Sequence, residues 1–176
     1  IVLEEGASIA RLGCAFCCMG GDYQKRPDSE VVSSIIAQAK HLTKDDPAIE
    51  ELVLSDQYPI RYLATLIEGA DKAGVRPLRW LFAARCDAFV KESTRIRNAL
   101  EVAARTGHVI ELYLSGFESF CDADLQRYNK GITVADQLAA ISAMRTHAGE
   151  FPGVFSYNRA RGHSLILWNP WTTPDN

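Results

Sequence analysis

The chain has 176 residues, of which 47% are apolar and 23% charged, and its formal net charge is −3. This length accommodates one domain with a substantial core, and the charge balance excludes the basic footprint of a nucleic-acid-binding protein. No apolar stretch approaches the roughly 20 residues that cross a bilayer. We expect one domain over residues 1–176, without a signal peptide and belonging to a longer protein, since the sequence begins with Ile1.

Strand-like and helix-like segments alternate along the chain. Short apolar runs predict strands at residues 1–3, 51–54, 79–83, 109–114 and 164–168. Apolar residues with a helical period predict helices after Asp28-Ser29, over residues 63–70 with a cap at Gly74, over residues 93–105 with a stop at Gly107, and after Thr133. The last helix is expected to bury a stripe of Val134, Leu138, Ile141 and Met144, and residues 149–163 are expected to be irregular.

This alternation predicts an α/β fold, namely a partial (β/α) barrel of parallel strands with helices outside. A complete barrel of eight units needs about 250 residues, so this chain should hold about five to six β/α units. The loops that follow parallel strands share one face of such a fold. Polar residues that follow different strands are therefore expected to converge on one site.

A thiol cluster follows the first predicted strand. Three of the five cysteines fall within residues 14–18, and Cys14 and Cys17 have a spacing that suits one metal or cluster, or a redox pair. Cysteines this close together do not suit a disulfide framework, which favours a reduced, cytoplasmic setting. A zinc site would need two further ligands, and the four histidines show no paired spacing. A zinc or dithiol α/β protein stays as a weaker alternative.

The chain resembles the core domain of the radical S-adenosylmethionine (SAM) superfamily. The family signature is C-x3-C-x2-C after the first strand, and residues 14–17 match its last two cysteines, with Ala10 in the place of the first. Residues 116–119, Leu125 and residues 129–131 are similar to the family's fourth-strand block, and residues 164–173 are similar to its fifth-strand run. Asp56 with Tyr58 loosely resembles the D-[DN]-x-[FY] pattern of the cobalamin-associated branch.

The resemblance implies that three cysteine thiolates, two of them from Cys14 and Cys17, hold a [4Fe-4S] cluster that binds SAM. Cleavage of SAM would give a 5′-deoxyadenosyl radical for a methylation, a rearrangement or a related reaction of the transferase, lyase or isomerase type. The implied partners are an unknown substrate and a reductant such as flavodoxin or ferredoxin. Cobalamin, if it is used, would bind to a domain outside this chain.

The resemblance also assigns residues to SAM. Glu118 would bind the ribose hydroxyls, and Lys130 would pair with the SAM carboxylate at a position where arginine is commoner. Lysine cannot form the bidentate fork of arginine. Ser164 stands where some members carry an aspartate.

Asp56 and Arg85 complete the predicted cofactor-binding set, because each follows a predicted strand. Each has a simpler alternative. Asp56 could cap a helix before Ile60, and Arg85 could form an ion pair with Asp87.

Ala10 leaves two functions open, because a methyl group cannot ligate iron. The first is a radical SAM enzyme whose cluster assembles despite the substitution. The second is a cluster-deficient barrel that acts as a binding or scaffolding module.

Overall fold

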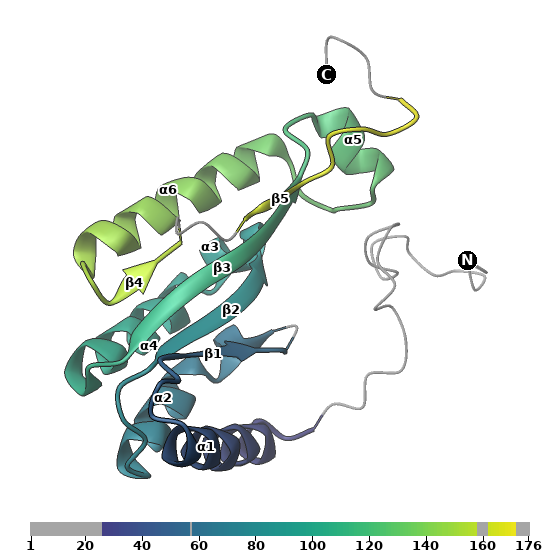
Figure 1. Cartoon of the computed structure of the whole chain (residues 1–176). Helices are drawn as coiled ribbons and strands as arrows, with labels where there is room; N and C mark the ends of the chain where they lie inside the picture. Colours follow the sequence, from purple (N-terminus) through teal and green to yellow (C-terminus); the bar gives the residue numbers. More distant parts are fainter. Residues whose placement is uncertain (1–25, 57, 158–161, 172–176) are drawn as a thin grey trace.

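The computed structural model describes residues 26–56, 58–157 and 162–171, and its centre is a parallel sheet (Figure 1). Neighbouring strands follow the order β1-β2-β3-β4, and β5 also pairs with β3. The strands are β1 (Glu51–Leu54), β2 (Arg79–Arg85), β3 (Val109–Glu118), β4 (Phe155–Ser156) and β5 (Ser164–Leu165). All four pairings are parallel. The predicted α/β fold is confirmed, and the strand predicted at residues 1–3 lies outside the described residues.

Helices connect the strands and cover the sheet. They are α1 (Asp28–Asp45), the 3-10 helix η2 (Pro59–Arg61), α2 (Leu63–Lys72), α3 (Cys86–Lys91), α4 (Ser93–Thr106), α5 (Asp122–Arg127) and α6 (Val134–Glu150). Alternate residues of β2 and β3, such as Trp80, Phe82, Ile110 and Leu112, are fully or nearly fully buried in one cluster with the apolar sides of the helices. This period of two follows from the pleat of a strand. Within the described residues, no helix is both long and apolar enough to cross a membrane.

The end of β3 departs from regular geometry. Gly116 pairs with Ser164 and Glu118 pairs with Leu165, and the register shifts between these two pairs. Glu118 has a φ of 66°, which places its backbone in the left-handed region that few residues other than glycine adopt. A bulge of this kind redirects the side chains that follow it.

The expectations about the elements need correction at four points. The fifth strand is shorter than predicted and ends at Leu165, and β4 lies within the segment that was expected to be irregular. The short helices α3 and α5 were not predicted, because six residues are too few to display a helical period. Pro27, rather than Asp28 or Ser29, occupies the N-cap position of α1.

The predicted stripe of α6 is also partly wrong. Leu138 is 56% exposed, whereas the buried positions of the helix are Gln137, Ala140, Met144 and His147. Gln137 is buried because its Nε2 donates to the carbonyl of Phe117, at 2.5 Å, where the bulge of β3 leaves the ladder. The predicted start at Thr133 is confirmed, since Thr133 and Asp136 form a reciprocal capping box.

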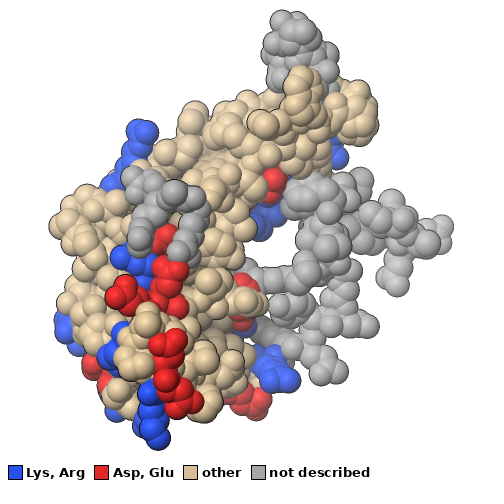
Figure 2. Space-filling model, viewed as in Figure 1, with Lys and Arg blue, Asp and Glu red and all other residues tan. Residues whose placement is uncertain are grey.

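Charge is unevenly distributed over the face drawn in Figure 2. Acidic and basic side chains lie beside one another over the lower part of the molecule, and the upper part around α5 and β5 is mostly uncharged. Exposed apolar side chains occur in and near these two elements. They are Phe120, Leu165, Leu167, Trp168 and Trp171.

Candidate functional site

A buried ion pair lies at the carboxyl end of β3. The Lys130 Nζ donates to Glu118 Oε1 at 2.9 Å, and the two side chains are 4% and 10% exposed. A carboxylate and an ammonium are seldom buried unless they are paired. Active sites of parallel α/β folds lie at this end of the strands, so the pair occupies the part of the sheet where chemistry is expected.

The turn after α5 carries Lys130 back to the sheet. Asn129 has a φ of 51° and Gly131 a φ of 69°, and the Lys130 N–H bonds to the Leu125 carbonyl at 2.9 Å. This hydrogen bond closes the end of α5 in the manner of a helix C-terminal motif. The sequence block that ends in Asn-Lys-Gly therefore builds a turn that aims one ammonium at Glu118.

Gly116 makes room for the ion pair. A Cβ at this position would lie 2.4 Å from Glu118 Oε1 and 3.0 Å from Lys130 Nζ. A real Cβ does not approach an oxygen to 2.4 Å without forcing a shift. The carboxylate and the ammonium thus lie over a bare stretch of backbone, and this explains the glycine of the motif in physical terms.

Ser164 and Arg85 support the pair from neighbouring strands. The Ser164 hydroxyl lies 3.4 and 3.3 Å from the two Glu118 oxygens. The Arg85 Nη2 donates to the Lys130 carbonyl at 2.6 Å, and its Nε donates to Asp87 at 3.0 Å. Although burial acts to raise it, hydrogen bonds from Lys91 and Arg85 hold the pKa of Asp87 below its ordinary value. Arg85 thus forms the predicted ion pair with Asp87 and also holds the backbone that carries Lys130.

Asp56 belongs to a different environment. Its Oδ1 accepts from the Tyr58 N–H at 2.8 Å, and its Oδ2 accepts from the Tyr62 hydroxyl at 3.0 Å and from Arg61 at 3.1 Å. Burial first, and then the charge of Asp56, raise the pKa of Tyr62 well above its ordinary value. These partners all lie in the loop and helices that follow β1. The structure therefore joins four of the five predicted SAM residues and leaves Asp56 in a local turn.

Cys14 and Cys17 lie outside the described residues, so their assignment as iron ligands stays a prediction. Among the residues that the structure does describe, no group of three or more His, Cys, Asp or Glu could hold a metal ion. Cys86 is buried, and its burial raises the pKa of the thiol. A neutral, buried thiol is a packing group rather than a ligand.

A second polar cluster at this end was not anticipated from the sequence. The amide of Asn169, which follows β5, donates to the Tyr128 hydroxyl at 2.7 Å and lies 3.4 Å from Asp124 Oδ2. Asp124 is 4% exposed and also accepts from Arg127 at 2.7 Å, and the Arg127 guanidinium lies 5.6 Å from the ring of Trp171. These contacts tie the segment after β5 to α5. No local sequence signal marks them, because they join residues far apart in the chain.

A similar ion pair lies near the amino end of β3. Arg79 Nη1 is 3.2 Å from Glu111 Oε2, and the side chains are 28% and 2% exposed. The Ser156 hydroxyl lies 3.4 Å from the same oxygen. Here Glu111 pairs in register with Leu81, ahead of the register shift that β3 shows after Leu112. This second pair provides an internal comparison for the first.

The chain shares its fold with solved structures of one enzyme. No protein-family model matches the chain, and no curated protein matches it significantly. Among solved structures, the cobalamin-dependent S-adenosylmethionine radical enzyme OxsB, with aqua-cobalamin and S-adenosylmethionine bound, has a TM-score of 0.52 and 21% sequence identity. That match covers 74% of this chain and 20% of that enzyme.

Two further structures of OxsB give the same result. The apo, selenomethionine-labelled form has a TM-score of 0.52 and 18% identity over 86% of this chain. The form with aqua-cobalamin alone has a TM-score of 0.52 and 17% identity over 84% of this chain. Each of these matches covers 22% of the solved chain, so this chain spans about a fifth of the enzyme. At these identities the likeness shows a shared fold: the chain folds like a part of a cobalamin-dependent radical SAM enzyme.

Proposed function

We propose that this chain is the core domain of a radical SAM enzyme and that it binds SAM at the carboxyl end of its sheet. One observation carries the proposal: the buried Glu118–Lys130 pair lies over the bare backbone of Gly116, in a fold shared with a radical SAM enzyme. A carboxylate can accept hydrogen bonds from two ribose hydroxyls, and an ammonium can pair with a carboxylate. The two groups therefore suit the nucleoside and amino acid parts of SAM.

Binding would redistribute the hydrogen bonds of the pair. Glu118 already accepts from Lys130 and Ser164, so a ribose would add donors to a side chain that is already held in place. Lys130 donates up to three hydrogen bonds from one ammonium, and it can meet the SAM carboxylate while it keeps Glu118. Arg85 acts on this step through the Lys130 carbonyl. It holds the turn in position and leaves the ammonium to meet the ligand.

The cluster assignment rests on the sequence alone. Cys14 and Cys17 would supply two thiolates, and Ala10 stands where the third is required. The donor set therefore fits a three-thiolate cluster incompletely. When bound with three thiolates, a [4Fe-4S] cluster supplies the electron that cleaves SAM. A second function, a barrel that binds SAM without a cluster, is favoured by Ala10.

The first experiment measures SAM binding by equilibrium dialysis with radiolabelled SAM. The parent chain is compared with Glu118→Gln and with the matched control Glu111→Gln, which alters the ion pair that Glu111 of the same strand forms with the partly exposed Arg79. We expect binding by the parent and by the control, and a loss of at least tenfold in Glu118→Gln. If Glu118→Gln fails to fold, the double variant with Lys130→Met removes both charges and keeps the test. Equal affinity in all variants would overturn the assignment.

The second experiment separates the two functions. The parent and Ala10→Cys are reconstituted anaerobically with iron and sulfide, and the bound iron, visible absorbance and cleavage of SAM are measured. A radical SAM core predicts more iron and a brown colour in Ala10→Cys. If the variant holds no more iron than the parent, the cluster assignment fails, and SAM binding by a colourless protein then supports the second function.

A further inference from the structure

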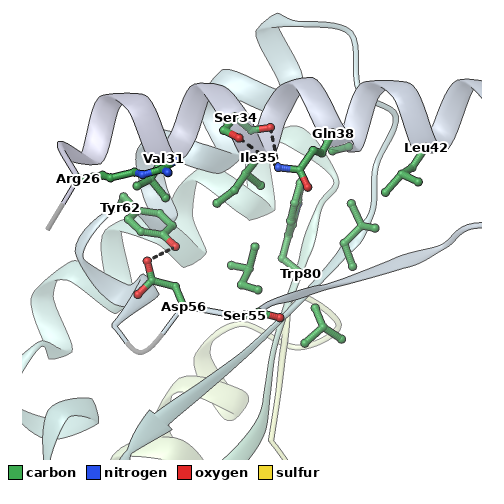
Figure 3. Close-up of a pocket in the computed structure, with 14 residues that line it drawn as sticks. Arg26, Val31, Ser34, Ile35, Gln38, Leu42, Ser55, Asp56, Tyr62 and Trp80 are labelled. Atoms are coloured by element: carbon green, nitrogen blue, oxygen red, sulfur yellow. Dashed lines mark hydrogen bonds between the residues drawn. The ribbon is translucent and has the colours of Figure 1, made fainter. Parts of the chain in front are cut away.

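Glu118 is held in place from a distant segment, whereas Asp56 is held by its own loop. At the end of β1, the Tyr62 hydroxyl contacts the Asp56 carboxylate beside a groove between α1 and β1 (Figure 3). At the end of β3, the Ser164 hydroxyl contacts the Glu118 carboxylate from 46 positions along the chain, and the Ile166 N–H donates to the Glu118 carbonyl at 2.7 Å. The geometry of Glu118 therefore depends on where β5 lies.

Strand β5 is too short to fix its own position. It consists of Ser164–Leu165, and the register of its ladder with β3 shifts between Gly116 and Glu118. A slip of one residue turns each side chain of a strand to the opposite face of the sheet. Such a slip would take the Ser164 hydroxyl away from Glu118, so contacts beside the ladder decide whether the two groups meet.

His163, directly before β5, makes such contacts with both of its ring nitrogens. Its Nδ1 accepts from the Ser115 N–H of β3 at 3.1 Å, and its Nε2 donates to the carbonyl of Tyr157, directly after β4, at 2.8 Å. A backbone N–H only donates and a carbonyl only accepts, so these partners fit the neutral imidazole with its proton on Nε2. Ser115 is fully buried, and it lies between the parts of β3 that pair with β4 and with β5. The imidazole thus takes the place of a strand between β4 and β5.

Two aromatic rings restrict the orientation of this imidazole. Phe117 of β3 meets it edge-on, with the ring centroids 5.6 Å apart and an interplanar angle of 87°. The ring of Tyr157 lies nearly parallel to it, at 6.4 Å and 26°. The rings and the two hydrogen bonds together hold His163 in one position, and with it the backbone that leads into Ser164.

We propose that His163 is a positioning residue of the Glu118 site. Its imidazole fixes the register of β5 on β3, and it thereby places the Ser164 hydroxyl against the Glu118 carboxylate. The inference rests on the proposed function only where it concerns SAM, because the contacts of His163 with β3 involve no ligand.

Hydrogen–deuterium exchange of the Ser115 and Ile166 amides tests the register in the full chain. We expect both amides to be protected in the parent and in the matched control His41→Phe, which makes the same substitution at an exposed histidine of α1. In His163→Phe, which keeps an aromatic ring but neither nitrogen, both amides should exchange at least tenfold faster, while the Ile110 amide, bonded to the chain before β4, stays protected. If the exchange of Ile166 is unchanged in His163→Phe, β5 holds its register without the imidazole and the proposal is overturned.

A conservative variant and the tautomer of the parent imidazole provide two further readouts. His163→Asn introduces a side-chain oxygen that accepts from the Ser115 N–H as Nδ1 does, so it should restore the protection that His163→Phe removes. Nitrogen-15 NMR of the parent should show an unprotonated Nδ1 and a protonated Nε2 for His163. A proton on Nδ1, or no rescue by His163→Asn, contradicts the proposal. The NMR measurement needs only the parent chain, so it decides the question even if His163→Phe does not fold.

The affinity for SAM in a double-variant cycle tests the link to the site. His163→Phe should lower the affinity about tenfold, the size of one hydrogen bond to a charged group, and should cost nothing further in a chain that already carries Ser164→Ala. If His163 only stabilised the fold, it would change the affinity by the same factor in both backgrounds, and this outcome overturns the inference. If the parent itself binds no SAM, the proposed function fails, whereas the exchange and NMR results still decide whether His163 sets the register of β5.

Discussion

Two glutamates of β3 each form an ion pair with a cation from another segment, yet the two pairs differ in their surroundings. Glu111 and Arg79 lie near the amino end, ahead of the register shift of β3, and the guanidinium is 28% exposed. Glu118 and Lys130 lie at the carboxyl end, where the strand bulges and the ammonium is 4% exposed. In parallel α/β folds the amino ends of strands serve stability and the carboxyl ends serve chemistry. Position on the sheet, rather than residue type, therefore distinguishes the two ion pairs.

The largest effect is expected from Glu118→Gln. This change leaves the buried Lys130 ammonium without its carboxylate, and removal of one member of a buried pair costs about 3–5 kcal/mol. Urea unfolding measures the loss. The double variant Glu118→Gln with Lys130→Met should regain much of it, because the ammonium is then removed together with the carboxylate. A loss under about 1 kcal/mol would show that the pair is hydrated.

Glu111→Gln should cost less, about 1.5–3 kcal/mol, which is typical of a hydrogen bond to a charged group. Arg79 is partly exposed, so water can solvate the guanidinium once the charge of Glu111 is removed. Urea unfolding of Glu111→Gln and of the parent measures this loss in the free energy of unfolding. If Glu111→Gln lowers the free energy of unfolding as much as Glu118→Gln does, the two ion pairs of β3 contribute equally to stability, which contradicts the prediction.

Gly116→Ala tests the geometry of the carboxyl end alone. The added Cβ would meet Glu118 Oε1 at 2.4 Å, and overpacking of this kind costs about 1–3 kcal/mol. Gly116→Ala should also lower the affinity for SAM, because the added Cβ displaces the Glu118 carboxylate. The matched control is Gly149→Ala in α6, where a Cβ meets nothing within 4 Å; it should stabilise the protein by about 0.5–1 kcal/mol.

The smallest effect concerns pH and the amino end of β3. His108 Nδ1 accepts from the Leu78 N–H and from the indole of Trp80, and burial lowers the pKa of His108 and of His147. Each imidazole is therefore neutral in the folded protein and takes up a proton first in the unfolded chain. Stability should fall as the pH drops below about 6.5, by at most about 1.4 kcal/mol per pH unit and per histidine, until the folded pKa is reached.

His108→Asn should reduce this pH dependence, because it keeps an acceptor near Leu78 and removes a titrating group. Thermal unfolding between pH 7.5 and 5 provides the measurement. An unchanged slope would assign the acid sensitivity to other groups.

Much of the candidate site could be predicted from the sequence, because its main residues lie within one short stretch of the chain. Glu118 and Lys130 fall in a contiguous block whose glycines and turn residues shape the end of β3 and the turn after α5. Asp56 was grouped with them because it follows a strand, but its partners Tyr58, Arg61 and Tyr62 are its own neighbours in the chain. Residues that follow different strands share an edge without necessarily sharing a site.

The order of residues along the chain was enough to predict the alternation of strands and helices, the helix start at Thr133 and the charged residues at the strand ends. Periodicity and capping depend on neighbours a few residues apart, so they can be read along the chain. Contacts in the folded protein bring Lys130 to Glu118 over Gly116, Arg85 to the Lys130 carbonyl and Asn169 to Tyr128. They also leave Leu138 exposed while Gln137 is buried. These outcomes depend on the bulge in β3 and on contacts between distant segments, which have no signature within any one segment.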